Sequence, residues 1–128
     1  MTYQDALDYL FPLHRFGIRP GLDRVLELME VLGSPHTRLG QIIHIAGTNG
    51  KGTTASAIAS IFQASGRKTA LYTSPHLIDF TERIRIDGAQ IPREKVAAYC
   101  SRLKDAASGR HVTFFEATTA IAFAWFAD

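Results

Sequence analysis

The chain has 128 residues, of which 46% are hydrophobic and 20% are charged, and its formal net charge is +2. This is the size of one ordinary domain, and the composition excludes a disordered or fibrous chain. The small net charge shows no sign of the clustered lysines and arginines of nucleic-acid-binding proteins, so we expect no nucleic-acid partner.

The cysteine content and the N-terminus indicate the compartment. A single cysteine, Cys100, excludes an intrachain disulfide and a cysteine-rich metal site, and a reduced compartment is the simplest interpretation. Residues 1–5 lack the basic stretch and apolar run of a secretory signal, and no apolar run reaches the length of a membrane span. We therefore expect a cytoplasmic protein that enters no membrane.

Two helices are predicted in the first 40 residues. Apolar side chains recur at helical spacing over residues 3–11, Thr2 and Asp5 resemble a capping box, and Pro12 ends this helix. A second amphipathic helix is predicted over residues 22–32. Turn formers lie before and after it, at Gly17, Pro20, Gly21 and Gly33.

The next segment predicts a βαβ unit over residues 41–73. Residues 41–46 form a nearly continuous apolar run, which is typical of a strand buried on both faces of a parallel sheet. A glycine-rich loop follows, then a helix with an apolar stripe from Ala55 to Phe62 that ends at Gly66. Residues 68–73 predict a second strand, and the crossover should be right-handed.

A half-exposed strand, a helix and a strongly apolar segment complete the chain. Residues 83–86 alternate and then turn at Asp87 and Gly88. Pro92 opens a helix that carries Cys100 on its apolar face, so we expect this thiol in the core. Residues 107–110 predict a loop.

The last segment, residues 114–128, predicts a helix that is apolar on all sides. Such a helix is normally buried completely, and nothing follows it in the chain. We therefore expect a piece of a longer protein, or a partner surface that covers this helix.

The glycine-rich loop is the strongest local signal for chemistry. Its glycines allow a tight turn that exposes consecutive N–H groups at the start of a helix, which forms an anion site. Lys51 adds a positive charge for the β- and γ-phosphates, and the hydroxyl of Thr53 can reach Mg²⁺. The predicted nucleotide-binding residues are Gly47, Thr48, Asn49, Gly50, Lys51, Gly52 and Thr53.

This loop departs from the standard G-x-x-x-x-G-K-[ST] pattern. Ile45 stands where the pattern has its first glycine, and Gly52 delays the hydroxyl by one residue. The alternative is a glycine-rich turn with a solvent-exposed lysine, but a buried strand before the loop and an amphipathic helix after it favour the phosphate site. The predicted fold class is α/β and P-loop NTPase-like, with a mostly parallel sheet flanked by helices.

Several ordered motifs resemble the folylpolyglutamate synthase/dihydrofolate synthase family of the Mur ligase superfamily. Residues 44–53 (HIAGTNGKGT) resemble its nucleotide loop, and residues 72–77 (YTSPHL) with 80–84 (FTERI) resemble its second signature. The matches run almost from end to end, and the remaining ones are residues 21–24, 32–35 and 113–116. The resemblance implies one incomplete N-terminal ATP-binding domain, with helices in residues 1–40 and the P-loop part in residues 41–128.

The resemblance implies an ATP-dependent ligase with Mg²⁺ as its second cofactor. ATP would phosphorylate a folate or dihydropteroate carboxylate, and the amine of L-glutamate would attack the acyl phosphate to form an amide. Lys51 would act on the transferring phosphoryl group. By resemblance, Ser74 and Glu116 supply metal ligands beside Thr53. His76 and Arg83 are candidate substrate contacts. Family members are much longer, so ligation should require a C-terminal portion of the same protein.

Each of these residues also has a structural interpretation. Ser74 could cap the turn before Pro75, and Glu116 could match a helix dipole. A lone histidine such as His76 is often structural. Arg83 and Arg85 could hold an anionic substrate tail or lie on a solvated strand face.

Two other functions stay open at this point. A Mur-type ligase of peptidoglycan precursors shares the loop type, although the segment after the second predicted strand favours the folate branch. A non-catalytic nucleotide-binding module could instead dock its apolar C-terminal helix on a partner.

Overall fold

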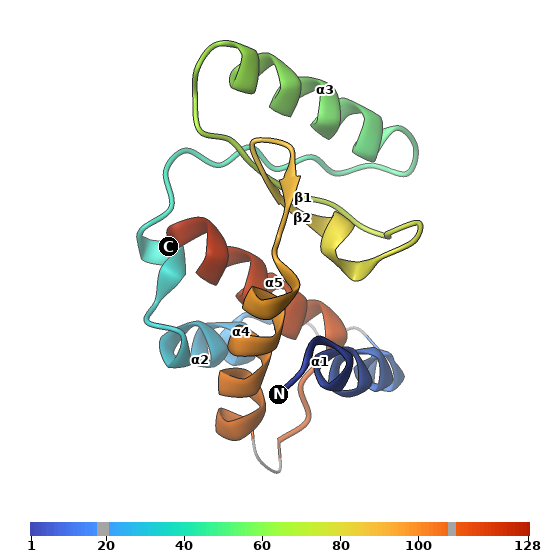
Figure 1. The fold of residues 1–128 in the computed structure, drawn as a ribbon, viewed down its shortest axis with the longest axis vertical. Coiled ribbons are helices and arrows are strands. Elements are labelled where there is room, and N and C mark those ends of the chain that lie inside the picture. Colours follow the sequence, from blue (N-terminus) through green and yellow to red (C-terminus); the bar gives the residue numbers. More distant parts are fainter. Residues whose placement is uncertain (18–20, 108–109) are drawn as a thin grey trace. The chain divides into compact units, whose positions relative to one another are not determined.

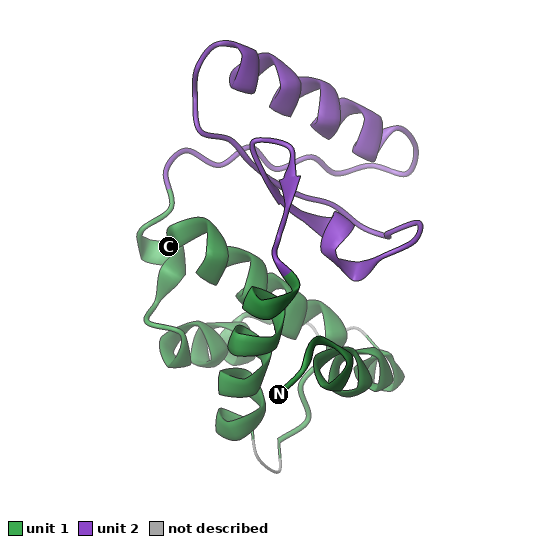
Figure 2. Cartoon of the chain, viewed as in Figure 1, with its two compact units in different colours: residues 1–39, 93–128 green, residues 40–92 purple. Residues whose placement is uncertain are grey.

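The computed structural model describes residues 1–17, 21–107 and 110–128. They form two compact units, residues 1–39 with 93–128, and residues 40–92 (Figure 2). The predicted turn former Pro20 and residues 108–109 of the predicted loop lie outside the described residues. The second unit begins where the sequence divides the helices from the P-loop part, but residues 93–128 join the first unit. A single ATP-binding domain stays a prediction.

The described part of the first unit is helical, and it confirms the helices predicted at both ends of the chain (Figure 1). The 3-10 helix η1 continues α1 at the position where Pro12 was expected to end it. The elements are α1 (Tyr3–Leu10), η1 (Phe11–Phe16), α2 (Asp23–Val31), η2 (Pro35–Thr37), α4 (Arg93–Ala106) and α5 (Phe114–Ala127).

Capping boxes start two of these helices. The Asp5 N–H donates to Thr2 Oγ1 at 3.1 Å, and the Thr2 N–H donates to Asp5 Oδ2 at 2.8 Å, as predicted for α1. Thr113 and Glu116 form the same reciprocal pair at the start of α5. Each pair satisfies two helix N–H groups that would otherwise lack a partner, and such a cap contributes about 1 kcal/mol.

Helix α5 lies at the centre of the first unit, against α1, α2, α4, η1 and η2. Ala120, Ile121 and Ala122 are fully buried there. The predicted helix is confirmed, and helices from earlier in the chain cover most of its surface. One large side chain is an exception, since Phe115 is 64% exposed.

Cys100 lies in the core of the first unit, as predicted. Its side chain is fully buried, and its thiol lies 3.8 Å from the carbonyl oxygen of Ala6. Burial raises the pKa of the Cys100 thiol to about 12, because a thiolate there would lose its hydration.

The second unit contains one long helix and a small antiparallel sheet. The strand order is β1-β2-β3, with Tyr72 opposite Ile84 and Arg85 opposite Gln90. The predicted mostly parallel arrangement is therefore wrong for the described strands. The elements are α3 (Lys51–Ala64), β1 (Ala70–Tyr72), η3 (Phe80–Arg83), β2 (Ile84–Ile86) and β3 (Ala89–Gln90).

A local signal explains the β2–β3 hairpin. Asp87 and Gly88 connect the strands with φ angles of 50° and 82°. Two left-handed residues in a two-residue loop match the twist of paired strands, and Asp-Gly is a preferred sequence for such a turn. The predicted turn at these residues is confirmed.

The strand predicted over residues 41–46 is absent. Ile42 and Ile43 are 67% and 56% exposed, whereas a strand of a parallel sheet would bury both faces. A strand requires neighbours that satisfy its backbone, and none of the described strands pairs with this segment. The predicted βαβ unit thus keeps its helix and its second strand and lacks its first strand.

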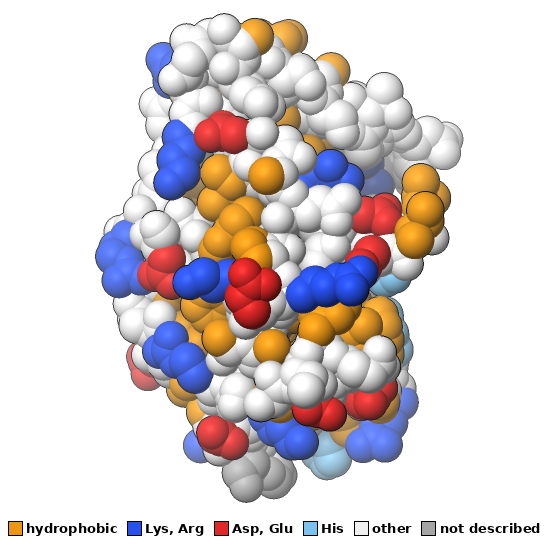
Figure 3. All heavy atoms as spheres, in the orientation of Figure 1, with side chains coloured by type: hydrophobic (Ala, Val, Ile, Leu, Met, Phe, Trp, Pro, Cys, Tyr) orange, Lys and Arg blue, Asp and Glu red, His pale blue; other side chains and the backbone are white. Residues whose placement is uncertain are grey.

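Charged side chains of both signs are interspersed on the face shown in Figure 3. That pattern agrees with the small net charge of +2. Among the described residues, no helix is both long enough and apolar enough to cross a membrane.

The position of Ile121 predicts a large loss of stability on truncation. We expect Ile121→Ala to lower the free energy of unfolding by about 2–5 kcal/mol, because a buried side chain is removed and a cavity remains. Urea unfolding followed by circular dichroism measures the change. Phe115→Ala on the same helix is the exposed control and should cost less than about 1 kcal/mol. Equal losses for the two variants would contradict this packing.

The burial of Cys100 predicts an inert thiol. At pH 8 the folded chain should not react with a thiol reagent such as DTNB, because the protonated form dominates well below a pKa of about 12. The same chain in urea should react with one equivalent. Rapid reaction of the folded chain would place this thiol at the surface.

Candidate functional site

The predicted phosphate loop leads directly into α3, and its backbone requires glycine. Gly50 adopts a left-handed conformation with φ 75°, and Gly47 has a φ of 151°. A Cβ atom at Gly50 would meet no atom within 4 Å, so conformation and not crowding accounts for this glycine.

Among residues 1–17, 21–107 and 110–128, no side chain caps the N-terminus of α3. Gly50 is the N-cap residue, and no side chain accepts a hydrogen bond there. The first N–H groups of this 14-residue helix therefore lack helical partners, and the helix dipole adds partial positive charge. Lys51 and Thr53 in the first turn are exposed. These groups together form a site that can bind an anion such as a phosphate.

Ser74 and His76 lie on the loop that connects β1 to η3. The base of this loop is closed by the Thr73 N–H, which donates to the carbonyl oxygen of Arg83 at 2.9 Å. Ser74 is exposed. His76 Nδ1 accepts a hydrogen bond from Arg83 Nε at 2.8 Å. This bond selects the neutral imidazole with its proton on Nε2, because Nδ1 serves as the acceptor.

The two arginines predicted near the substrate are engaged with the protein. Arg83 is only 8% exposed, and burial lowers the pKa of its guanidinium. Arg85 donates from Nε to the Glu82 carbonyl oxygen at 3.2 Å. The structure thus brings Arg83 to His76, and a contact of Arg83 with substrate stays a prediction.

Glu82 is a residue whose role the sequence does not reveal. Its Oε1 accepts the Leu77 N–H at 3.0 Å, and its Oε2 accepts the N–H groups of Ile78 and Asp79 at 2.9 and 2.6 Å. The N–H groups of Asp79, Leu77 and Ile78 lower the pKa of Glu82, since they stabilise the carboxylate. The Asp-x-x-Glu spacing of a capping box could have indicated part of this arrangement.

Glu116 belongs to the first unit, whereas Thr53 and Ser74 belong to the second. Glu116 is 6% exposed, and its Oε1 accepts the Thr113 N–H at 3.0 Å. Within residues 1–17, 21–107 and 110–128, no cluster of three or more His, Cys, Asp and Glu side chains could hold a metal ion. The metal role of Glu116 stays a prediction, and its capping role is present.

A pocket of about 310 Å³ lies between α2 and α5 in the first unit. The sequence does not reveal it, because it forms only where the two helices meet. His36 contributes an Nδ1 atom that is buried and without a hydrogen-bond partner among the described residues. The lining is mainly apolar and comes from Gly21, Leu22, Val25, Leu26, Met29, His36, Thr113, Phe115, Glu116, Thr119 and Phe123.

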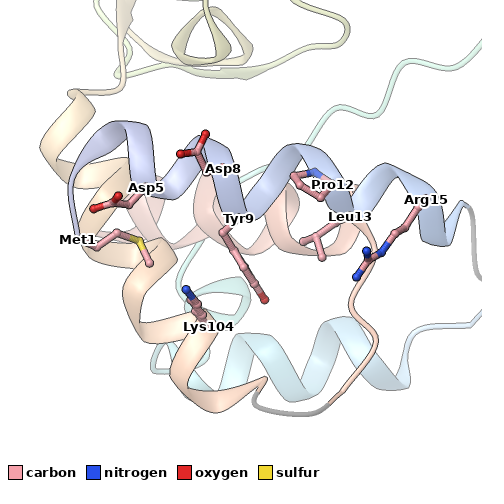
Figure 4. A pocket seen from close by; sticks show the side chains of 8 residues that line it. All are labelled: Met1, Asp5, Asp8, Tyr9, Pro12, Leu13, Arg15 and Lys104. Carbon is pink, nitrogen blue, oxygen red and sulfur yellow. The ribbon is translucent and has the colours of Figure 1, made fainter.

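A second hollow of about 540 Å³ lies beside α1 and η1 (Figure 4). Its charged groups already take part in the fold. Asp5 belongs to the α1 cap, Asp8 accepts from Gln4 Nε2 at 2.9 Å, and Lys104 Nζ lies 5.7 Å from the centre of the Tyr9 ring. Tyr9 and Asp8 extend to opposite sides of the helix, so these groups do not converge on one point.

Curated relatives match the chain over nearly its whole length. A dihydrofolate synthase/folylpolyglutamate synthase of Bacillus subtilis is 39% identical over 99% of this chain and 31% of its own length. A probable bifunctional folylpolyglutamate synthase/dihydropteroate synthase of Haloferax volcanii is 40% identical over 100% of this chain and 16% of its own length. The chain thus spans less than a third of these two relatives.

Solved structures give the same result. The structure described as E. coli FolC in complex with DHPP and ADP has a TM-score of 0.84 at 35% identity, over 99% of this chain and 30% of that one. A structure described as an FPGS-AMPPCP-folate complex has a TM-score of 0.79 at 39% identity, over 98% of this chain and 32% of that one. Both confirm the predicted α/β class.

No protein-family model matches the chain. The identities, the TM-scores and the near-complete coverage of this chain nevertheless agree on one group of proteins. The chain belongs to the folylpolyglutamate synthase/dihydrofolate synthase family, and it matches less than a third of the length of these members.

Proposed function

We propose that this chain is the nucleotide-binding part of an ATP-dependent ligase that adds L-glutamate to a folate or dihydropteroate carboxylate. The uncapped N-terminus of α3 beside Lys51 is the observation that carries the proposal. Relatives described as complexes with ADP or AMPPCP support a nucleotide at this loop. Ligation would also require segments of the kind that lie in the rest of the relatives' length. The buried single thiol is consistent with a cytoplasmic location.

The reaction has two steps. The γ-phosphoryl group of ATP passes to a carboxylate oxygen of the substrate, and ADP leaves. The amine nitrogen of glutamate then attacks the acyl carbon, phosphate leaves, and the nitrogen loses a proton as the amide forms. The N–H groups of residues 51–53 and the Lys51 ammonium would stabilise the negative charge that the phosphoryl oxygens carry during transfer.

The oxygen donors of the second unit fit a Mg²⁺ ion that arrives with the nucleotide. Thr53 and Ser74 offer neutral hydroxyl oxygens, and Mg²⁺ usually completes its shell with phosphate oxygens and waters. Bound there, the ion would offset repulsion between the phosphates and the substrate carboxylate. The metal role of Glu116 stays a prediction, and its Oε1 accepts the Thr113 N–H as part of the α5 cap.

His76 would act on the substrate as a hydrogen-bond donor. Arg83 Nε occupies Nδ1 at 2.8 Å, which leaves the proton on Nε2. A neutral donor suits the anionic acyl phosphate, because it stabilises the oxygens without supplying a proton that would convert the attacking amine to its ammonium form.

The pocket between α2 and α5 fits the ring system of the substrate. Phe115 is 64% exposed at this pocket, and an aromatic face can stack on a flat heterocycle. His36 Nδ1, which has no hydrogen-bond partner within the described part of the chain, can bond to a polar ring edge. Relatives described as complexes with folate and with DHPP support a site of this kind. We therefore assign the pteridine ring to this pocket.

Replacement of Lys51 should weaken nucleotide binding. In calorimetric titrations of MgATP into the 128-residue chain, we expect Lys51→Ala to bind about 10–100-fold more weakly, because a charge-assisted bond to phosphate is worth about 1.5–3 kcal/mol. Lys68→Ala, an exposed lysine of the same unit outside the loop, is the control and should bind as the natural chain does. If the natural chain and both variants bind MgATP with equal affinity, Lys51 does not contact the nucleotide and the proposed site is wrong.

Replacement of Phe115 should weaken binding of the pteridine ring. We expect Phe115→Ala to bind dihydropteroate about tenfold more weakly in a fluorescence titration, because ring stacking and burial contribute about 1–2 kcal/mol. Ile61→Ala removes an exposed apolar side chain from the second unit and is the control. If the Phe115 variant binds as tightly as the control, the ring lies elsewhere.

A further inference from the structure

The loop of residues 74–79 carries Ser74 and His76, and its aliphatic side chains do little to hold it in place. Leu77 and Ile78 are 93% and 91% exposed, and Ser74 is exposed as well. Apolar burial, which fixes most loops to their scaffold, therefore cannot define the conformation of this segment. Its order has to come from hydrogen bonds.

Those hydrogen bonds converge on the carboxylate of Glu82. Three consecutive N–H groups of the loop, at Leu77, Ile78 and Asp79, donate to it over distances of 2.6 to 3.0 Å. Both carboxylate oxygens are used, so a single side chain determines the path of half the loop. The N–H groups lower the pKa of Glu82, because they stabilise its ionised form.

Glu82 itself is held firmly. It belongs to η3, whose Phe80 is 1% exposed, and the Thr81 hydroxyl donates to Gln90 Oε1 at 2.6 Å. The next residue, Arg83, bonds to His76 through its side chain and to the Thr73 N–H through its carbonyl oxygen. Two consecutive residues of one short helix thus fix both ends of the loop.

We propose that Glu82 is a positioning residue that holds the 74–79 loop so that Ser74 and His76 face the metal–nucleotide site. This inference rests on the proposed function. In this proposal Glu82 contacts neither nucleotide nor substrate, and its carboxylate serves the three backbone N–H groups of the loop. It acts through the loop, whose fixed conformation lowers the ordering cost of binding MgATP.

Glu82→Gln is the decisive variant, because an amide offers one acceptor oxygen and turns an NH₂ group toward the remaining loop N–H groups. Glu94→Gln makes the same chemical change at an exposed carboxylate of α4 and is the matched control. In hydrogen exchange followed by NMR, the amides of residues 77–79 should exchange about tenfold faster in Glu82→Gln and unchanged in Glu94→Gln. Unchanged exchange in both variants overturns the proposal without any reference to nucleotide.

The nucleotide readout separates positioning from a general structural role. Glu82→Gln should bind MgATP about tenfold more weakly than the natural chain does. Its affinity for metal-free ATP should stay within about twofold of the natural value, because Ser74 on this loop is a proposed ligand of the metal ion. A double-mutant cycle tests whether Glu82 acts through Ser74. In a Ser74→Ala background, Glu82→Gln should weaken MgATP binding by less than about twofold, because both changes remove the same interaction. Full additivity, or equal losses with and without Mg²⁺, overturns the inference.

The two proposals fail in different ways. If Lys51→Ala weakens MgATP binding and Glu82→Gln does not, the nucleotide site is supported and the positioning role is wrong. If the natural chain binds no MgATP, both proposals are wrong. Should Glu82→Gln lose the circular dichroism spectrum of the natural chain, Glu82→Asp takes its place with the same readouts, because it keeps the charge and shortens the reach.

Discussion

Burial of α5 is the constraint on which the first unit depends. This helix contacts every other helical element of its unit, and the middle of it is inaccessible to solvent. Its N-terminus is fixed by the Thr113–Glu116 capping box, so the direction in which the helix leaves the loop is also defined. The same first turn lines the apolar pocket, because Phe115 projects outward where its neighbours project inward. Core and candidate substrate pocket therefore share one helix.

The second unit is held together differently. Helix α3 has no buried residue, and the strands are two or three residues long. The candidate site depends on the backbone geometry of this unit. Gly50 is left-handed, and the first N–H groups of α3 have no helical partner. The 74–79 loop is held by hydrogen bonds from its N–H groups to a carboxylate. Such features depend on conformation and hydrogen bonding more than on a large core, which agrees with the polar character of the groups that bind phosphate.

Local features of the fold were predictable, and non-local ones were not. Spacing of apolar residues and caps such as Thr2 with Asp5 identified the helices, because these signals act within a few residues. The segment 41–46 shows the limit. An apolar run predicts a strand only if neighbouring strands exist to pair with it, and sequence periodicity says nothing about those neighbours. The antiparallel pairing of β1 with β2 was missed for the same reason.

The candidate site shows the same division. The glycine-rich loop and its lysine are contiguous, so the sequence reveals them together. The bond between Arg83 and His76 and the three N–H groups on Glu82 require the chain to fold back through η3. The Asp-x-x-Glu spacing indicates only the bond from the Asp79 N–H. The pocket between α2 and α5 needs two helices from opposite ends of the chain.

Glu116 illustrates why a residue's location does not settle its role. A capping box accepts Gln as readily as Glu, so the cap of α5 requires an acceptor oxygen and not a negative charge. The negative charge of Glu116 also interacts favourably with the helix dipole, which contributes about 0.3–1 kcal/mol. This interaction occurs in any helix with an acidic first turn. A metal ligand requires more, namely an oxygen that points away from the cap toward other ligands. The Thr113 N–H uses one acceptor position of Oε1, and each carboxylate oxygen has two, so this bond alone excludes neither oxygen from a metal ion. The capping role of Glu116 is therefore compatible with a metal role, which stays a prediction.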